Sequence, residues 1–401
     1  MMNKEEKKAP QVRFKGFVDD WEQRKYGEVI DLLSGQDFSP SEYNDTCTGI
    51  PYMTGASCIV GNETIVNRWT TVPRCLAEKG DVLLVCKGSG YGTIAVLAQD
   101  KAHIARQFMA LKNLSNLDKV FNFYILNSVI ENIKKDARGL IAGIARDAVM
   151  KQEIAIPLLE EQFQIGTFFK QLDNLITLLQ RKLDKLQKLK QGFLQQLFPQ
   201  YGENVPRLRF ANFQGGWEQR KLGDLLSEVK RPIRMKDEEE YQLVTVKRRN
   251  EGIVSRGFFK GKEILVKSYC ELRSGDYLIS KRQVVHGANG IVPKNLDGAI
   301  VSNEYLIAIG NKSITSEFLS AISKLPQMYK LFFLSSYGID IEKLVFDVED
   351  WKKRGVSIPS VDEQNRTTHF FNKLDNLIAL LQTKLDKFQS FKKTYLQKMF
   401  I

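Results

Sequence analysis

One block of 31 residues occurs twice in this chain of 401 residues. The first copy, residues 168–198, is FFKQLDNLITLLQRKLDKLQKLKQGFLQQLF, and the second, residues 370–400, is FFNKLDNLIALLQTKLDKFQSFKKTYLQKMF, with 19 identical positions and no gap. A shorter duplication opens each half: RFKGFVDDWEQRK begins at Arg13 and RFANFQGGWEQRK at Arg209. The chain is therefore two tandem copies of one plan, a divergent body followed by a closely repeated segment. We expect pseudo-twofold symmetry and a bipartite partner.

The bulk composition favours a polyanionic partner and a reducing compartment. The net charge of +12 suits nucleic acid better than an acidic small molecule, although charge alone does not decide the matter. The five cysteines are odd in number and none lie at Cys-x-x-Cys spacing, which predicts free thiols rather than disulfides or a zinc site. The N-terminal residues form no apolar signal sequence, and no run approaches the roughly 18 apolar residues of a membrane span. We therefore expect a cytoplasmic protein without membrane contact.

The order of segments predicts an α+β fold with two α/β bodies, each followed by a long helix. Pro157 and Pro359 stand just before the two helical patterns, and Pro199 ends the first. The stretch GDVLLVCK at residues 80–87 is echoed by GDYLISKR at residues 275–282, so both bodies should contain a similar strand. The expected boundaries are a disordered leader 1–12, body 13–158, helix 159–198, linker 199–206, body 207–360 and helix 361–401.

The repeated helices carry a heptad pattern. In each copy, large apolar residues recur every seven positions, with further apolar residues between them and a lysine (Lys182, Lys384) as the polar exception. The positions are Leu172, Leu179, Leu186 and Phe193 with Leu175 and Leu189 between, and Leu374, Leu381, Phe388 and Tyr395 with Leu377 and Phe391 between. A single amphipathic helix usually just covers a core. Because both copies break the stripe at the same place and keep a leucine beside it, Leu183 and Leu385, we expect the helices to pair as a coiled coil. At ~1.5 Å per residue they would form a spacer of roughly 46 Å.

Catalytic motifs are absent from the sequence. It contains no phosphate-binding loop with a following Lys-Ser/Thr, no H-E-x-x-H and no G-x-S-x-G. An Asn-Pro-Pro-aromatic segment, typical of amino-group DNA methyltransferases, is also missing. The three histidines, His103, His286 and His369, are too scattered for a metal cluster or a repeated acid–base pair. The sequence therefore predicts no catalytic residue, no metal site and no cofactor in this chain.

A glycine-rich stretch in the first body, KGSGYG, includes Lys87, Ser89 and Tyr91. It follows an apolar strand, as a nucleotide-binding loop would, but the next residues are again typical of a strand. A hairpin turn is the favoured interpretation, since glycine supplies positive φ at low cost. A third interpretation is a DNA contact, in which glycines let the backbone approach a phosphate and Lys87 neutralises it.

The second body has denser clusters of candidate base-contacting residues near such turns. Arginine and lysine can pair with guanine, and glutamine or asparagine with adenine. The candidates are Lys247, Arg248, Arg249, Lys281, Arg282, Gln283, His286 and Asn303, with Arg106 and the KGSGYG residues as the first-body counterparts. Weaker first-body candidates include Asn62 and Arg146. A charge run is usually only a solvated surface, so the argument depends on clustering rather than on any single residue.

With both duplications in view, the chain resembles the specificity subunit of type I restriction–modification systems. The residues that carry the resemblance are Arg13-Phe14 and Arg209-Phe210, the two WEQRK segments, and Leu-Asp-Asn-Leu-Ile in each helix after Ile-Pro. It covers essentially residues 12–401, and the order body, helix, body, helix is itself distinctive. The one departure is Asn212, where the first copy has Gly16.

The resemblance implies that residues 13–158 and 207–360 are target recognition domains, each for one half of a split double-stranded DNA site. The helices would pair antiparallel, set a separation of roughly 13 base pairs, and dock two modification subunits. Those subunits would carry S-adenosylmethionine, and two restriction subunits would use ATP and Mg. This chain would contribute recognition without catalysis. Because the bodies share little sequence, the site should be asymmetric.

Two alternatives from other functional classes remain open. One is an assembly scaffold whose bodies bind protein rather than DNA. The other is a single-chain DNA-modifying enzyme with an unrecognised active site. Within the favoured interpretation, the sequence leaves open the DNA target, the spacer length, the base-contacting side chains, and whether a restriction subunit accompanies the chain.

Overall fold

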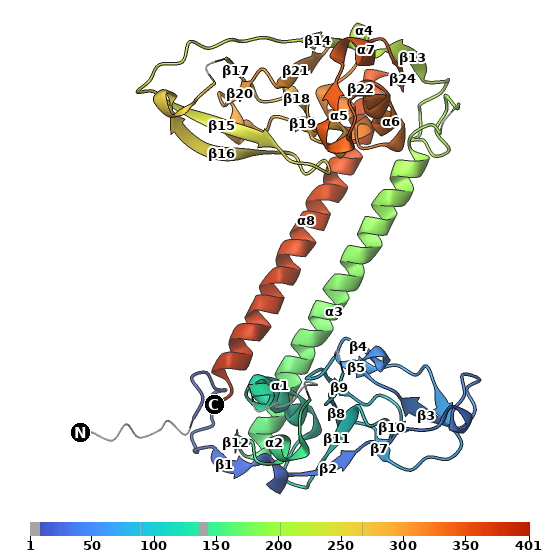
Figure 1. Cartoon of the computed structure of the whole chain (residues 1–401), viewed down its shortest axis with the longest axis vertical. Helices are drawn as coiled ribbons and strands as arrows, with labels where there is room; N and C mark the ends of the chain where they lie inside the picture. The colour runs from blue at the N-terminus through green and yellow to red at the C-terminus, as the bar shows by residue number, and fades with distance from the viewer. Residues whose placement is uncertain (1–8, 89, 136–142, 201, 267) are drawn as a thin grey trace. The chain divides into compact units, whose positions relative to one another are not determined.

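A computed structural model describes residues 9–88, 90–135, 143–200, 202–266 and 268–401 (Figure 1). Its internal contacts form two compact units, residues 1–181 with 382–401, and residues 182–381. The division cuts both long helices, α3 (Leu159–Gln196) and α8 (Val361–Lys398). Each unit thus contains one body, the start of the helix that follows it, and the end of the other helix.

The first body contains two main sheets and a short ribbon. The larger sheet has the order β2 (Ile30–Ser34), β11 (Phe108–Asn113), β8 (Val82–Val85), β9 (Ile94–Val96), β5 (Glu63–Thr64), β4 (Ile59–Val60). The second has the order β6 (Trp69–Thr70), β3 (Ile50–Met53), β10 (Lys101–Ile104), β7 (Leu76–Glu78). The ribbon pairs β1 (Glu22–Lys25) with β12 (Glu153–Ile156), and helices α1 (Lys119–Lys135) and α2 (Arg146–Met150) complete the body.

The second body repeats this plan. Its first sheet has the order β14 (Leu226–Glu228), β21 (Tyr305–Gly310), β18 (Tyr277–Ser280), β19 (Asn289–Ile291). Its second has the order β16 (Ile253–Lys260), β15 (Glu240–Val246), β20 (Ile300–Ser302), β17 (Tyr269–Glu271), and β13 (Glu218–Lys221) pairs with β24 (Gly355–Ile358). The connecting helices and short pieces are α4 (Leu222–Leu225), α5 (Ser316–Ile322), α6 (Pro326–Leu334), β22 (Ser336–Tyr337), β23 (Val345–Phe346) and α7 (Val348–Lys352). The two bodies therefore share a topology even though their sequences have diverged.

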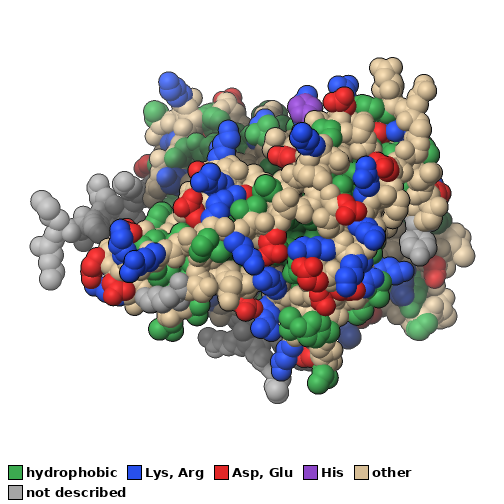
Figure 2. All heavy atoms as spheres, turned by 90° about the horizontal axis from the view of Figure 1, so that it is seen from above, with side chains coloured by type: hydrophobic (Ala, Val, Ile, Leu, Met, Phe, Trp, Pro, Cys, Tyr) green, Lys and Arg blue, Asp and Glu red, His purple; other side chains and the backbone are tan. Residues whose placement is uncertain are grey.

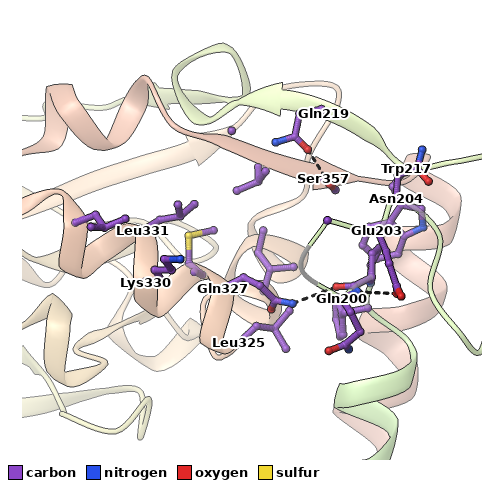
Figure 3. Close-up of a pocket in the computed structure, with 18 residues that line it drawn as sticks. Gln200, Glu203, Asn204, Trp217, Gln219, Leu325, Gln327, Lys330, Leu331 and Ser357 are labelled. Atoms are coloured by element: carbon purple, nitrogen blue, oxygen red, sulfur yellow. Dashed lines mark hydrogen bonds between the residues drawn. The ribbon is translucent and has the colours of Figure 1, made fainter.

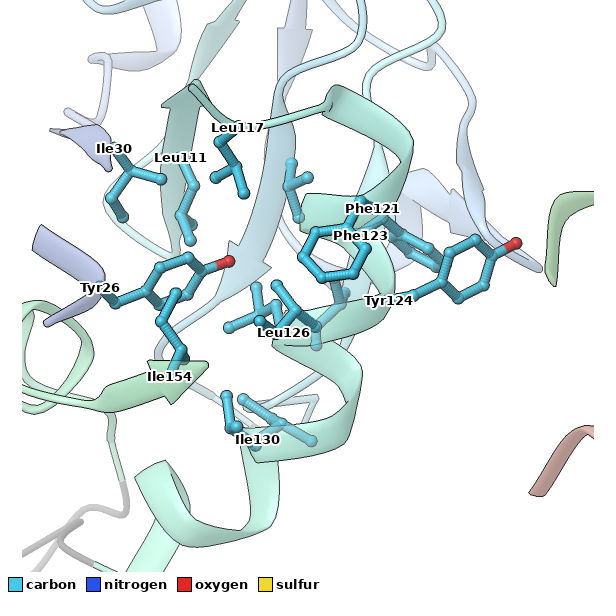
Figure 4. Packing of buried hydrophobic residues seen from close by; sticks show 14 of the residues in the cluster. Tyr26, Ile30, Leu111, Leu117, Phe121, Phe123, Tyr124, Leu126, Ile130 and Ile154 are labelled. Carbon is cyan, nitrogen blue, oxygen red and sulfur yellow. The ribbon is translucent and has the colours of Figure 1, made fainter. Parts of the chain in front are cut away.

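The central strand of each body is buried on both faces, which explains its uninterrupted apolar sequence. In β8, Val82 and Leu84 belong to the cluster that includes α1, while Leu83 and Val85 belong to the cluster under the second sheet. Alternate side chains of a strand point to opposite faces, so one strand serves both cores. Figure 4 shows the α1 side of this core, where Phe121, Phe123 and Leu126 lie opposite residues of the sheet.

A buried ion pair fixes the start of each long helix. Glu161 and Glu363 are almost fully buried, and each accepts two hydrogen bonds of 2.7 Å from an arginine, Arg13 and Arg209 respectively. These contacts raise the pKa of both arginines, chiefly through the hydrogen bond to the glutamate. A bidentate guanidinium offsets the cost of removing a carboxylate from water. The paired Arg-Phe segments of the sequence are therefore anchors that tie each body to its helix.

The one departure between the two Arg-Phe segments has a backbone explanation. Gly16 has φ = 99° and Asn212, the residue at the same place, has φ = 75°. Asparagine is among the few non-glycine residues that adopt this left-handed region readily. The turn that follows each arginine anchor is thus preserved.

Within each unit, the two long helices run antiparallel and are joined by ion pairs. In the first unit Asp173 of α3 accepts a bond of 2.5 Å from Lys392 of α8, and in the second Lys190 pairs with Asp375. Both pairs occupy the same positions of the 31-residue block. Aromatic contacts between the helices repeat in the same way. The ring centroids of Phe168 and Tyr395 lie 5.6 Å apart. The equivalent rings, Phe193 and Phe370, lie 4.9 Å apart. The predicted antiparallel pairing is confirmed inside each unit.

The predicted register of the helix seam was partly wrong. The positions every seven residues are half-buried or buried, as expected: Leu172, Leu179, Leu186, Phe193, Leu374, Leu381, Phe388 and Tyr395. The intervening positions Leu175, Leu189, Leu377 and Phe391 are instead exposed. The seam is completed one residue later, at Leu183 and Leu385, which are 2% exposed. The second seam position lies four residues after each heptad position rather than three. Lys190 and Lys392 are the polar residues at these second positions.

The leader prediction also needs correction. Residues 1–8 lie outside the described residues, but the backbone N–H of Val12 donates to the carbonyl of Lys398 at 3.0 Å. The equivalent bond in the second unit joins Leu208 to Gln196 at 3.0 Å. The ordered chain therefore begins before Arg13, because the segment ahead of each arginine pairs with the end of a long helix.

Replacing Arg209 with alanine should strongly destabilise the second unit. The buried Glu363 would lose its guanidinium partner, a change that typically costs about 3–5 kcal/mol. Urea denaturation of Arg209→Ala would measure the loss. Arg207→Ala is the matched control, since the Arg207 side chain is 68% exposed and its pair with Glu203 is long, at 3.7 Å, so about 0.5 kcal/mol or less is expected. Equal effects of the two substitutions would contradict the anchoring role.

Candidate nucleic-acid interface

The candidate residues of the two bodies lie at the same place in the fold. In the first body, Cys86 N–H donates to the carbonyl of Gln107 at 2.7 Å, and its own carbonyl accepts from Ile144 N–H at 2.8 Å. In the second, Lys281 makes the same two bonds, to Glu304 at 3.0 Å and from Phe346 at 3.0 Å. Lys87 therefore corresponds to Arg282, and Arg106 to Asn303, at the end of the central strand and the start of its neighbour.

In the second body, four loops meet at this edge. Arg249 N–H donates to the carbonyl of His286 at 2.7 Å, which joins the β15–β16 turn to the turn after β18. Lys281 Nζ donates to the carbonyl of Asn303 at 2.9 Å. Glu342, on the loop between β22 and β23, accepts a bond of 2.7 Å from Arg248. The structure thus brings together all eight second-body candidates: Lys247, Arg248, Arg249, Lys281, Arg282, Gln283, His286 and Asn303.

Several buried polar atoms around the same turn have no hydrogen-bond partner in the described part of the chain. They are Asn250 Oδ1, Gln283 Oε1 and Asn289 Nδ2, while His286 Nε2 lies 3.5 Å from Glu342 Oε1. Leaving such atoms unpaired costs free energy, so their concentration makes this turn a candidate binding site. Arg249 and Asn250 also have positive φ values of 59° and 57°, and strained backbone of this kind clusters at binding sites.

The first-body candidates are more dispersed in role. The KGSGYG stretch is a hairpin turn, as favoured from the sequence: β8 pairs antiparallel with β9, and Gly88 and Gly92 have φ of 88° and 86°. Lys87 is exposed, while Ser89 lies outside the described residues. Tyr91 is half-buried against the core, with Lys134 Nζ 5.7 Å from its ring centroid.

Two weaker first-body candidates have structural partners instead. Asn62 donates to Asp173 at 2.7 Å, and Arg146 donates to the carbonyl of Leu32. Asp173 also accepts from Tyr124 at 2.7 Å, and burial together with this carboxylate raises the tyrosine pKa. Asn62 therefore connects the body to its helix, and Arg146 joins α2 to β2 inside the body.

Sequence reasoning missed the acidic and apolar members of the interface. Asp37 binds Arg106, with Oδ2 2.6 Å from Nε, and Glu304 binds Arg282 at 2.7 Å. Ile339, on the same loop as Glu342, has the largest exposed fraction of any large hydrophobic side chain in the described residues, 108%. No local pattern marks these residues, because their partners are distant in the sequence.

Positive charge is mixed with negative charge on the surface. Figure 2 shows one face on which lysine and arginine side chains are scattered among aspartate and glutamate, without an unbroken basic stripe. Attraction to a polyanion from such a surface depends on the few cations that have no carboxylate beside them. Among the described candidate residues, no ion pair is formed by Lys87, Lys247, Arg249 or Lys281, and Lys281 Nζ donates to a backbone carbonyl.

A large groove in the second unit lies elsewhere, between the segment after α3 and helix α6 (Figure 3). Its volume is about 880 Å³, and Gln327 donates to the carbonyl of Pro199 at 3.1 Å across one side. Among the described lining residues, the ionisable ones are Glu203 and Lys330. Within the described ranges, no three His, Cys, Asp or Glu side chains gather as metal ligands, and no helix is long and apolar enough to cross a membrane.

A buried histidine holds the loop that carries Asp37. His103 Nδ1 accepts from the backbone N–H groups of Arg74 and Cys75 at 3.2 and 3.1 Å, and Nε2 lies 2.7 Å from the carbonyl of Gln36. This arrangement requires a neutral ring with the proton on Nε2. Burial lowers the pKa of His103, opposed by the Gln36 carbonyl, while Arg74 lowers it further and Asp37 and Glu42 raise it.

Comparison with known proteins shows what the chain is similar to. A model of the type I restriction modification DNA specificity domain matches residues 18–188. The type I restriction enzyme MjaVIII specificity subunit of Methanocaldococcus jannaschii is 20% identical over 401 residues, covering 94% of this chain and 91% of the relative. Residues 18–188 therefore match a type I restriction modification DNA specificity domain, and the chain is similar to a specificity subunit over nearly its whole length.

Further similar proteins carry related descriptions. The putative MjaX specificity subunit of the same organism is 26% identical over 186 residues, 44% of this chain and 42% of that protein. The crystal structure of the type I restriction–modification S subunit from M. genitalium matches the fold with a TM-score of 0.65 at 17% identity, covering 98% of this chain and 99% of the other. A chain from a structure of the type I R-M system matches with a TM-score of 0.50 at 16% identity, over 94% and 96%.

Lowering the pH should destabilise the first body through protonation of His103. The folded pKa lies below the unfolded value near 6.5, so the unfolded chain binds more protons between these values. The contribution of neutral His103 to stability is therefore fully present above about pH 6.5. As the pH drops below that value, the free energy of unfolding falls by up to ~1.4 kcal/mol per pH unit. Urea denaturation between pH 7 and 5 would measure the slope. His103→Gln should reduce it, whereas His369→Gln, an exposed helix position, should not; equal slopes for both variants would refute the assignment.

Proposed function

We propose that this chain supplies DNA sequence specificity to a type I restriction–modification complex, with each body contacting one half of a split site. The observation that carries the proposal is the shared location of the candidate residues, at one strand-end edge, in both bodies. Two bodies with one topology and unlike side chains at one place are suited to two unlike DNA segments. Lys87 and Arg106 stand where the second body has Arg282 and Asn303, so the two half-sites should differ.

The repeated helices support a second role, the docking of catalytic partners. Each copy exposes apolar residues at equivalent positions: Leu175, Leu178 and Leu189 on α3, and Leu377, Leu380 and Phe391 on α8. Apolar stripes exposed to water commonly mark protein interfaces. Two equivalent stripes fit two copies of one partner, the modification subunit, which would carry S-adenosylmethionine. Two restriction subunits using ATP and Mg would complete the assembly, and this chain would act without catalysis of its own.

The two long helices would also hold the bodies apart. Each spans 38 residues, and a continuous helix resists bending along its length. A fixed spacer would make the gap between the two half-sites a property of the helix length. Changing that length by insertion would then change the gap rather than the bases recognised.

The main rival function is a scaffold that binds only proteins, which the exposed apolar stripes alone would also fit. Salt dependence distinguishes the two, because contacts with phosphates weaken steeply and log-linearly as salt rises. A protein-only interface would show no comparable slope with added duplex DNA.

Methylome sequencing of cells that express this chain with its modification subunit tests the proposed function. We expect N6-methyladenine in a split, asymmetric motif that is absent without this chain. The base sequences of the two half-sites would follow directly from the motif. A stable complex of the two proteins without any new methylation would refute the DNA role and favour the scaffold.

Substitutions on the stripes test docking and its stoichiometry. Leu175→Glu with Leu178→Glu should leave one modification subunit bound instead of two, because a charge in an apolar contact is costly to desolvate. Native mass spectrometry of the complex would count the subunits, and the equivalent pair Leu377→Glu with Leu380→Glu should give the same loss. Gln187→Glu, an exposed position on the opposite face of α3, is the control. Two bound subunits in every variant would rule out docking on these stripes.

A further inference from the structure

Two interface arginines are each held by a carboxylate in the same manner. Arg106 Nε lies 2.6 Å from Asp37 Oδ2, and the Asp37 carboxylate also accepts from the Arg106 backbone N–H at 3.0 Å. Arg282 Nε lies 2.7 Å from Glu304 Oε2. The arginine side chains remain 72% and 56% exposed. One such pair stands at the strand-end edge of each body, and the pairs are not inherited from the repeat, since Arg106 lies in the turn before β11 and Arg282 in the turn after β18.

The atom through which each arginine is held determines what the rest of it can bind. The contact is a hydrogen bond from Nε for Arg282 and an ion pair at Nε for Arg106. The two terminal nitrogens of each guanidinium have no hydrogen-bond partner among the described residues, so they remain available. They form a planar fork of donors that matches the O6 and N7 acceptors of guanine in the major groove. A carboxylate on Nε restricts rotation of the guanidinium, so the fork is oriented before DNA arrives.

We propose that Arg282 recognises a guanine in the half-site of the second body and Arg106 a guanine in the half-site of the first. Glu304 and Asp37 are positioning residues that orient the two forks. The inference rests on the proposed function and adds to it the base and the side chain in each half.

The carboxylates have a second effect, on DNA of the wrong sequence. A negative charge beside the arginine repels phosphates, so the arginine contributes little to sequence-independent binding. Lys87 and Lys247, which have no ion pair among the described residues, remain to attract the backbone. Phosphate contacts carry no sequence information, and reducing them at the arginines widens the difference between correct and incorrect sites.

The test measures binding of the complex with the modification subunits to DNA duplexes. Each duplex carries the motif that methylome sequencing identifies. Each guanine of a half-site is replaced in turn by 7-deazaguanine, which lacks the N7 acceptor. One replacement in the second-body half-site should weaken binding about 10-fold or more. Arg282→Lys retains the charge but loses the fork. The variant complex should therefore bind the natural site as weakly as the wild-type complex binds the duplex with 7-deazaguanine, and the replacement should not weaken its binding further. It should respond normally to replacements in the other half-site, where Arg106→Lys should show the converse pattern.

Glu304→Gln tests the positioning role against a control of equal charge. It should raise affinity for non-cognate DNA about two- to five-fold and lower the ratio of cognate to non-cognate affinity. Glu239→Gln also removes one negative charge, from a pair with Lys236 at the far end of β15, and should leave the ratio unchanged. Equal ratios for the two variants would overturn the positioning role.

Three outcomes separate the inference from the function beneath it. A second-body half-site without a G·C pair, or an Arg282→Lys variant with the full 7-deazaguanine penalty, would overturn guanine recognition by Arg282. Those results would leave the specificity role intact. A wild-type complex that does not distinguish the motif from scrambled DNA would overturn the proposed function itself.

Discussion

The buried arginine–glutamate pair at the start of each long helix is the interaction on which the rest of the structure depends. A carboxylate at 3% side-chain exposure, such as that of Glu363, is tolerated only with a partner that satisfies both oxygens. Arg209 does so in the second unit, and Arg13 does the same for Glu161 in the first. These pairs set where each helix begins relative to its body. The neighbouring glutamines extend the attachment, since Gln162 and Gln364 each bond to three backbone groups of their own unit.

Each body is completed by the end of the other repeat's helix. Trp21 packs on Phe400 with ring centroids 6.3 Å apart, and Trp217 packs on Phe198 at 5.9 Å. Neither core is therefore assembled from one repeat alone, which explains why the sequence similarity is concentrated in the helices and the tryptophan segments. Residues that contact another repeat must change together, whereas the bonds described for the strand-end loops are made within their own body. The fold thus constrains the sequences of the helices and the tryptophan segments, whereas the sequences of the strand-end loops can differ between the two bodies.

The duplication predicted the architecture because its pattern is long and periodic, whereas the helix register required information that the sequence lacks. Leu175 and Leu183 are equally apolar, and both three- and four-residue steps keep a side chain near the seam; only packing shows that Leu183 is buried. The second-body candidates that cluster in the sequence also lie close together in the structure. Sequence clustering could not supply their acidic partners, because Asp37 lies 69 residues from Arg106 and Glu342 lies 94 from Arg248. Such pairs are made by the sheets, not by local sequence.

The interface combines costs that a purely structural edge would avoid. Asn250 and Gln283 hold unpaired buried oxygens, two residues have positive φ without being glycine, and Ile339 is fully exposed to water. These features are unfavourable in the free chain, and a well-packed body can carry them because its stability comes from elsewhere. The first-body edge shows fewer of them among the described residues, where Lys87 and Arg106 stand over an ordinary hairpin. A binding surface that remains incompletely satisfied until its ligand arrives favours a partner able to pair with several of these groups at once, which non-cognate DNA cannot do.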